Sequence, residues 1–484
     1  MKLPSLVLIN PNLVSQKNDI ASSGIPYWPI TLAYAAAALR QKGFPLRVID
    51  AFGAKPKQIT TWDNFYVQGL TPQEILAQLR TRKVDCLITY AGMVHNHEVH
   101  LNLIRRLRQA YPQTPIITLE NTQQVTSYVL SEVSSQFLEA GATTIYTGEP
   151  EKTLDKVIMK KIRGLYNSHP EKPIMNLDRL LFPAWDLFPV KSYWNLGYAH
   201  GPITYSKYLP MYTSRGCPFS CAFCTIPALN ARLWRGRTGQ NVVDEMEYWH
   251  SKWGIREFHF EDVNPAMVSS RMADISHEII KRKLPVIWKI TSGTKVEAIK
   301  PEVIPLMAKA GCRYISISPE SGSPRMLQLM NKPFAHDLAL GQIKRMHASG
   351  ITTQACFVLG FPGEIKDDLR QTAKYIRKLA QVGLDEVALF IMTPIPGSSQ
   401  WGKISGFHFL SQLTFSPSWR RDFKPLHFFR LMLFAKFTFY RLLYNPASLV
   451  KSFVGLVTGS FHTKTEMTIH RLLRVRLWSF LYAR

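Results

Sequence analysis

Three cysteines of this chain lie close together in one short segment, and thiolates are the ligands that iron–sulfur clusters require. Cys217, Cys221 and Cys224 make up half of the six cysteines of the 484-residue chain. Three thiolates on one loop could hold three irons of a four-iron cluster and leave the fourth open, as a catalytic zinc keeps an open position. The alternative is three buried cysteines that merely share a loop. The flanking Gly216 and Pro218 indicate an exposed turn, which favours the cluster.

The Cys-x-x-x-Cys-x-x-Cys spacing, with the aromatic Phe223 before the last cysteine, resembles the radical SAM superfamily. The resemblance implies that Cys217, Cys221 and Cys224 hold a 4Fe–4S cluster whose open iron is chelated by S-adenosylmethionine. The reduced cluster would give one electron to the sulfonium, so that the carbon–sulfur bond breaks. The resulting 5′-deoxyadenosyl radical would then abstract hydrogen from a substrate. Such an enzyme needs a reductant, for example flavodoxin or ferredoxin.

Residues 206–400 repeat a strand-then-helix unit six times, which predicts a partial (β/α)6 TIM-type barrel as the radical SAM core. Barrel chemistry gathers at the carboxyl ends of strands, and the cysteine loop follows the first expected strand. A glutamate after the fourth strand could accept hydrogen bonds from ribose hydroxyls, and glycines after the fifth permit close contact with an adenine ring. Together with the resemblance, this implies that the residues contacting S-adenosylmethionine are Phe223, Asp262, Glu320, Ser321, Gly360, Phe361 and Gly363.

Residues 1–160 alternate apolar runs with helix-like segments, which predicts a parallel, Rossmann-like α/β sheet. No G-x-G-x-x-G follows the first strand, so a dinucleotide is not expected. The segment resembles the cobalamin-binding domain found ahead of many radical SAM cores, through Pro26 to Pro29, the Gly148-Glu149 turn, and Phe182 to Asp186 in the linker. The resemblance implies bound cobalamin. Relatives carry Gly-Gly after the fourth strand where this chain has Leu119-Glu120-Asn121, so a domain kept for substrate contact or structure is the alternative.

Residues 401–484, at the end of the chain, are predicted to form a basic, hydrophobic, helical tail. The whole chain has a net charge of +25. From Pro425 to Arg484, nine Lys or Arg residues stand against one acid, Glu466. Charges interrupt the apolar run too often for a membrane-spanning helix. Large apolar side chains with Lys and Arg between them are typical of a helix that lies on an anionic lipid surface. The alternative is a helical subdomain that packs on the barrel and lines a substrate entrance. Nucleic acid is not expected as a partner, because such an arm would be solvated rather than rich in Leu and Phe.

These observations together favour a cytoplasmic enzyme, with the inner face of a membrane as a second location. Residues 161–205, rich in Pro, Trp and Tyr, are interpreted as a linker. Cys86, Cys312 and Cys356 occur singly in apolar contexts and are expected to be core residues in a reducing compartment. The favoured function is a cobalamin-dependent radical SAM C-methyltransferase acting on a hydrophobic, natural-product-like or lipid-like small molecule. The alternatives are a ring-closing or rearranging enzyme like the anaerobic porphyrin cyclase, a cobalamin-independent radical SAM enzyme, and a non-catalytic binding protein.

Overall fold

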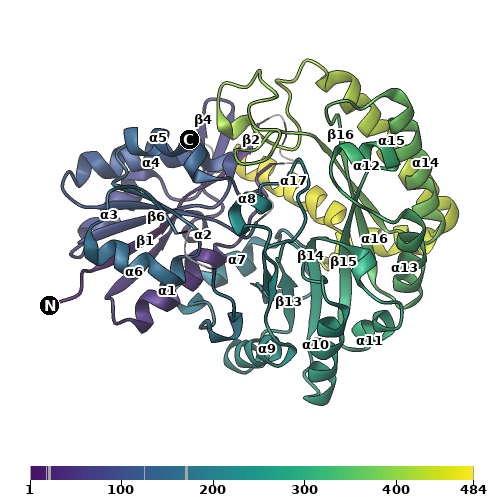
Figure 1. Cartoon of the computed structure of the whole chain (residues 1–484), viewed down its shortest axis with the longest axis horizontal. Helices are drawn as coiled ribbons and strands as arrows, with labels where there is room; N and C mark the ends of the chain where they lie inside the picture. Colours follow the sequence, from purple (N-terminus) through teal and green to yellow (C-terminus); the bar gives the residue numbers. More distant parts are fainter. Residues whose placement is uncertain (1, 18, 20–22, 125, 169–172, 483–484) are drawn as a thin grey trace.

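The computed structural model describes residues 2–17, 19, 23–124, 126–168 and 173–482. Two parallel sheets lie side by side, and the last helix of the chain reaches from the second sheet to the N-terminal part (Figure 1). The last two residues of the basic tail, including Arg484, lie outside the described part of the chain.

The N-terminal sheet has six parallel strands, in the order β3 (Leu46–Asp50), β1 (Leu6–Asn10), β6 (Cys86–Ala91), β7 (Ile116–Glu120), β8 (Thr144–Thr147) and β9 (Gly164–Asn167). Strands covered on both faces are apolar throughout, and every residue of β6 is buried. The sheet is accompanied by helices α1 (Ile30–Gln41), α2 (Ala51–Ala54), α3 (Pro72–Arg80), α4 (His97–Ala110), α5 (Ser134–Glu139) and α6 (Pro150–Lys160). A small antiparallel sheet is formed by β2 (Leu13–Gln16), β5 (Phe65–Gln68) and β4 (Ile59–Trp62). The expected α/β sheet is confirmed, and β9 extends it into the range that the sequence predicts to be linker.

The second sheet also has six parallel strands, in chain order: β10 (Tyr208–Met211), β13 (Glu257–Phe260), β14 (Ile287–Thr294), β15 (Cys312–Glu320), β16 (Thr352–Leu359) and β17 (Glu386–Ile391). The long helices between them are α9 (Gly239–Trp253), α10 (Ser269–Lys281), α11 (Val303–Lys309), α13 (His336–Ala348) and α14 (Lys366–Gln381), with the shorter α12 (Pro324–Leu329) after β15. After β10 the chain forms β11 (Ser214–Arg215), α8 (Ile226–Asn230) and β12 (Arg235–Gly236). The predicted partial (β/α)6 barrel is therefore confirmed.

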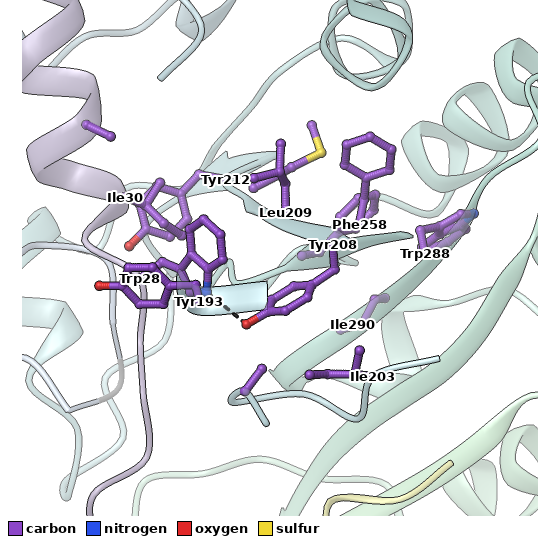
Figure 2. Close-up of a cluster of buried hydrophobic side chains, with 14 of the residues drawn as sticks. Trp28, Ile30, Tyr193, Ile203, Tyr208, Leu209, Tyr212, Phe258, Trp288 and Ile290 are labelled. Carbon is purple, nitrogen blue, oxygen red and sulfur yellow. Dashed lines mark hydrogen bonds between the residues drawn. The ribbon is translucent and has the colours of Figure 1, made fainter. Parts of the chain in front are cut away.

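One buried aromatic cluster joins the two sheets (Figure 2). Trp28, just before α1, packs against Tyr193 of α7 (Val190–Leu196), with ring centroids 4.4 Å apart. The indole Nε1 of Trp28 donates a hydrogen bond of 2.9 Å to the hydroxyl of Tyr208 on the first barrel strand. Buried aromatic rings contribute large apolar areas, so this cluster fixes the two sheets relative to each other.

The tail consists of three helices, α15 (Phe423–Tyr444), α16 (Pro446–Thr458) and α17 (Lys464–Tyr482). Helix α15 packs on α14 and β17, whereas α17 crosses the middle of the molecule and reaches β4 of the N-terminal part (Figure 1). The backbone N–H groups of Lys464 and Thr465 donate to the Glu386 carboxylate at 3.0 and 2.9 Å, which fastens the start of α17 to β17. The tail is thus a helical subdomain packed on the barrel, the alternative reading of its sequence. None of the helices in the described residues is long and apolar enough to cross a membrane.

Candidate functional site

The three clustered cysteines lie on the loop between β11 and α8, at the carboxyl end of the first barrel strand. All three are half-buried free thiols. Gly216, directly before them, has φ +78°, and a Cβ there would collide with the carbonyl oxygen of Leu233, so only glycine fits. The loop therefore leaves β11 in a tight turn that presents the thiols of Cys217, Cys221 and Cys224 on one side of the barrel.

A second segment, at the end of α12, supports the cysteine loop from outside. The carbonyl of Met330 accepts a hydrogen bond from the Ala222 N–H at 2.8 Å. The side-chain amide of Asn331 donates to Ser220, at 3.0 Å to its carbonyl and 2.7 Å to its hydroxyl. Lys332 follows in the chain and is largely buried. The loop after β15 and α12 thus positions both the cysteine backbone and a nearby positive charge.

Buried charges of both signs surround the thiols. Lys332 Nζ lies 3.4 Å from Glu320 Oε1, and it interacts electrostatically with all three cysteines, which with Glu320 keep the pKa of its ammonium above the ordinary value despite burial. Burial raises the pKa of Glu320, and Lys332 opposes that shift. Burial also raises the pKa of Cys224 to about 12. A cluster held here would bind thiolates, and Lys332 would offset part of their negative charge.

A cavity of about 680 Å³ begins at this loop and passes through the barrel to the tail helices. Its cysteine end is lined by Phe223, Cys224 and Glu320. Its middle is lined by side chains of β14, β15 and β16, and its far wall comes from α15 and α17. A volume of this size is typical of small-molecule sites. The cavity therefore has a reactive end at the cysteines and a separate end at the tail.

Two of the residues predicted to contact S-adenosylmethionine line this cavity, namely Phe223 and Glu320. Glu320 ends β15 with φ +65°, a left-handed conformation that is costly for a residue with a side chain. Asp262 instead accepts hydrogen bonds from the Thr213 N–H at 2.7 Å and from the Ser214 hydroxyl at 2.6 Å. In this structure Asp262 therefore positions the chain that leads into the cysteine loop, and its contact with S-adenosylmethionine stays a prediction.

Four other predicted contacts, Ser321, Gly360, Phe361 and Gly363, follow the ends of β15 and β16 and do not line the cavity directly. The Ser321 hydroxyl lies 3.3 Å from the Thr372 hydroxyl and is fully buried. Gly360 has φ +72° and its carbonyl accepts a hydrogen bond of 2.9 Å from Arg420. Phe361 is buried in a small cluster that packs under the cysteine loop, and Gly363 has φ +86°. Their roles toward the cofactor stay predictions as well.

Buried ion pairs connect the cysteine loop to the Gly148-Glu149 turn of the N-terminal part. Arg215, directly before Gly216, donates to Glu151 at 2.6 Å and to Glu149 at 3.3 Å. Arg235 of β12 also donates to Glu149, at 2.8 Å. Burial alone would raise the pKa of Glu149, but Arg215 and Arg235 hold it below the ordinary value. The start of α6 is thereby fixed to the strand that carries the cluster loop.

The carboxyl edge of the N-terminal sheet also faces the site. Between the ends of β1 and β6, where the strand order reverses, a small hollow is lined by Leu13, Met93, His95 and Thr126, among others. This switch point is where open α/β sheets bind ligands. The hollow shares Ile25, Tyr27 and Phe415 with the main cavity, and the buried hydroxyl of Thr126 has no hydrogen-bond partner among the described residues.

A buried polar chain in the cavity wall carries no signal in the sequence. His200 Nδ1 lies 2.6 Å from Glu261, and its Nε2 lies 3.1 Å from Lys464 Nζ, which also donates to the Thr291 carbonyl at 2.6 Å. Lys464 belongs to the last helix, so only the folded chain brings it beside Glu261. Cys356, expected to be a core residue, also lines the cavity.

No three His, Cys, Asp or Glu side chains among the described residues are grouped to hold a single metal ion. His97 and His100 lie at the start of α4, where His97 is 2.8 Å from Gln136 and burial lowers the pKa of His100 to about 3. A four-iron cluster differs from a single ion because each thiolate binds a different iron. Three free thiols on one tight loop beside a cavity and a buried lysine fit that requirement.

Comparison with known proteins identifies the part of the chain that carries the cysteine loop. Residues 211–376 match the Radical SAM superfamily. An uncharacterized methyltransferase of Pyrococcus horikoshii is 25% identical over 87% of this chain and 86% of its own length. The anaerobic magnesium-protoporphyrin IX monomethyl ester cyclase of Rubrivivax gelatinosus is 29% identical over 77% of this chain and 65% of its own length.

Two solved structures share the arrangement of both sheets. The radical S-adenosylmethionine methyltransferase TsrM from Kitasatospora setae, with cobalamin and a [4Fe-4S] cluster bound, aligns with TM-score 0.62 and 15% identity over 83% of this chain and 78% of its own. The cobalamin-dependent S-adenosylmethionine radical enzyme OxsB, with aqua-cobalamin bound, aligns with TM-score 0.60 and 16% identity over 78% of this chain and 52% of its own. The resemblance found in the cysteine motif is thus confirmed for residues 211–376, which form a radical SAM domain.

Proposed function

We propose that this enzyme holds a 4Fe–4S cluster on Cys217, Cys221 and Cys224, cleaves S-adenosylmethionine there, and methylates a hydrophobic small molecule with cobalamin as methyl carrier. The observation that carries the proposal is the position of the cysteine loop. It lies at the carboxyl end of the first barrel strand, and Cys224 and Phe223 line one end of a cavity of about 680 Å³. A radical made at the open iron would therefore form at the inner end of the cavity that also holds the substrate.

The chain's own residues would bind and orient the sulfonium cofactor at that end. The Glu320 carboxylate, fixed by its backbone conformation and by Lys332, offers acceptors to ribose hydroxyls. Ser321, Gly360, Phe361 and Gly363 shape the surrounding wall, and Asp262 acts through the backbone of Thr213. In the domain division that we propose, the cobalamin-type part is 1–160, the linker 161–205, the radical SAM core 206–400 and the tail 401–484.

Cobalamin would bind at the carboxyl edge of the N-terminal sheet and would supply a transferable methyl group. Three observations support this place: the switch point between β1 and β6, the Thr126 hydroxyl that has no hydrogen-bond partner among the described residues, and the three lining residues that the hollow shares with the main cavity. TsrM and OxsB, which have this arrangement of domains, were solved with cobalamin bound. The curated relatives include several methyltransferases, which supports methyl transfer as the reaction.

A second candidate is a radical reaction without cobalamin. The observation that favours it is a closed junction between the sheet edge and the cysteine loop. Gln123 accepts from the Gly216 N–H at 3.1 Å and donates to Asn230 at 2.9 Å, and Thr225 donates to the Ser127 carbonyl at 3.0 Å. A corrin between the sheet edge and this loop would have to break these contacts.

Reconstitution under anaerobic conditions with iron, sulfide and hydroxocobalamin distinguishes the two candidates. The desalted protein should show the broad absorption of a 4Fe–4S cluster together with corrin bands. With dithionite, it should form 5′-deoxyadenosine from S-adenosylmethionine. Cluster absorption and 5′-deoxyadenosine without retained corrin would reject the cobalamin part and favour the second candidate. Absence of cluster and of cleavage would reject the whole proposal.

An external reductant, such as flavodoxin or ferredoxin, completes the reaction, because the cluster must be reduced before it can cleave the sulfonium. The substrate is a small molecule that fits the apolar part of the cavity. We also propose that the tail makes peripheral contact with a membrane, so that the enzyme works in the cytoplasm at the inner membrane face and acts on a lipid-like substrate.

A further inference from the structure

The three tail helices expose an unusual amount of apolar surface. On α16, Phe453 and Val457 are 69% and 74% exposed. On α17 the exposed apolar residues Ile469, Leu473 and Leu477 recur every four positions and lead to Phe480, which is 87% exposed. Residues three and four apart share one helix face, so these side chains form stripes. The further exposed members are Phe428, Leu431, Phe439, Leu442, Leu443, Val450, Val454 and Leu481.

The charge around these stripes has one sign. Between Phe423 and Tyr482 the only acid is Glu466, and it is buried, accepting hydrogen bonds from the Thr463 hydroxyl and the His462 N–H at 2.8 Å each. The exposed cations are Lys424, Lys436, Lys451 and Arg476. A protein partner recognised by apolar contact alone would not require this bias. An anionic lipid surface matches this bias, because it attracts both the apolar helix faces and the cations.

The cavity opens on the same helices. Leu431 of α15 and Ile469 of α17 line the cavity, yet they are 52% and 41% exposed, so they lie at its mouth. One turn further along each helix, Phe434 and Leu472 continue the lining. Among the described residues, the charged side chains that line the cavity are five Lys or Arg and two acids: Lys17, Arg430, Lys464, Arg471, Arg476, Asp19 and Glu320. An apolar space with excess positive charge favours a ligand that is apolar with an acidic group.

We propose that α15, α16 and α17 place the enzyme on an anionic lipid bilayer and that an acidic amphiphile enters the cavity from that bilayer between α15 and α17. The inference rests on the proposed function in one respect, that this cavity receives the substrate. The apolar body would lie against Phe434, Leu472 and the inner face of the barrel. Its acidic group would meet the cations of the wall, and its reacting carbon would reach the Cys224 end.

Co-sedimentation of the full-length chain with vesicles tests the docking surface. Binding is expected to vesicles of phosphatidylcholine with phosphatidylglycerol and to be at least ten-fold weaker to phosphatidylcholine alone. Lys436→Gln and Lys451→Gln should each weaken binding about five-fold, since each cation near an anionic surface contributes about that factor. Phe453→Glu with Val457→Glu should abolish it. Leu338→Glu, which changes a 45% exposed leucine on α13, is the matched control and should have no effect.

Equal binding to both vesicles, or no binding, would overturn the proposal. So would a stable dimer that Phe453→Glu with Val457→Glu dissociates while sedimentation with vesicles stays unchanged, because the stripes would then be a protein interface. Cleavage of S-adenosylmethionine should be unchanged in these surface variants. A failure of docking is therefore separate from a failure of the proposed reaction.

Fluorescent probes test the cavity without cluster, cofactor or turnover. A fluorescently labelled long-chain fatty acid should bind the unmodified protein at least ten-fold more tightly than the matching alcohol. Leu431→Glu should weaken both probes, because it places an anion at the mouth. Lys464→Met should reduce the difference in affinity between the fatty acid and the alcohol. Equal affinity for the two probes, or tight binding that Leu431→Glu leaves unchanged, would contradict entry between α15 and α17.

Discussion

Replacing Arg215 by Met tests how the N-terminal part holds the cysteine loop. Arg215 is 3% exposed and donates to two carboxylates, Glu149 and Glu151, on the far side of the junction. In this variant Glu149 would still accept hydrogen bonds from Arg235 and from the Ile174 N–H, both at 2.8 Å. Glu151, only 4% exposed, would lose both of its guanidinium hydrogen bonds. The cost therefore falls mainly on Glu151, which is left as a buried carboxylate without its countercharge.

Breaking a buried ion pair by removing one partner costs about 3–5 kcal/mol, and we expect Arg215→Met to lower the free energy of unfolding by that amount. Glu151→Gln removes the stranded charge, so the double variant should lose less than the sum of the two single variants by about 1–3 kcal/mol. At acidic pH the difference between parent and Arg215→Met should shrink. The pKa of Glu149 is held below its ordinary value, so this stabilisation is present above about pH 4.5 and is lost as the pH falls through the lowered pKa.

Urea unfolding of the apoprotein, followed by tryptophan fluorescence, measures these differences. Iron and sulfide bound per chain after reconstitution provide a second readout, because Arg215 directly precedes the loop and a displaced loop should hold less cluster. If the effects of Arg215→Met and Glu151→Gln on the free energy of unfolding add to that of the double variant within about 0.5 kcal/mol, the two residues are not coupled. If Arg215→Met lowers the free energy of unfolding by less than about 1 kcal/mol, the ion pairs do not stabilise the junction as proposed.

Three further changes follow from the structure. Trp28→Phe should cost about 2 kcal/mol in urea unfolding, because it leaves the buried Tyr208 hydroxyl without its 2.9 Å partner; an unchanged midpoint would contradict this. Burial raises the pKa of Glu364 to about 7, so ionisation destabilises the fold as the pH rises from about 4.5 to 7. Glu364→Gln should then gain up to about 3 kcal/mol over the parent at pH 8 and nothing at pH 4, and a gain independent of pH would count against it. Lys332→Met removes a cation beside Glu320 and the cysteines, so it should lower the reduction potential of the cluster by roughly 40 mV. An anaerobic redox titration followed by electron paramagnetic resonance measures this potential. A potential that rises or stays fixed would exclude the charge effect.

The strands and the cysteine loop could be predicted from the sequence because each depends on local patterns. Parallel strands buried on both faces are continuous apolar runs, as in Cys86–Ala91, and glycine marks the tight turn before the first cysteine. The order of strand ends then follows from the repeated strand-then-helix unit. These features need no knowledge of distant contacts.

The far wall of the cavity could not be predicted, because it depends on contacts between residues far apart in the chain. Lys464 meets Thr291 and His200, which lie 173 and 264 positions earlier. The composition of the tail allowed a helical subdomain packed on the barrel, but it did not indicate which residues of α17 would meet which strands. The partners of a side chain at a strand end are equally hidden from the sequence: the Asp262 carboxylate accepts hydrogen bonds from Thr213 and Ser214, and its contact with S-adenosylmethionine stays a prediction.

The central claim is that one loop of three cysteines holds the cluster at which S-adenosylmethionine is cleaved. The most direct test measures iron content, the electron paramagnetic resonance spectrum and 5′-deoxyadenosine formation after anaerobic reconstitution. It compares the parent with Cys217→Ala, Cys221→Ala and Cys224→Ala. The control is Cys312→Ala, whose thiol is buried in the barrel core. The account predicts that the parent and the control bind a 4Fe–4S cluster and form 5′-deoxyadenosine, and that each of the three loop variants loses both. A full cluster with turnover in any loop variant would contradict it.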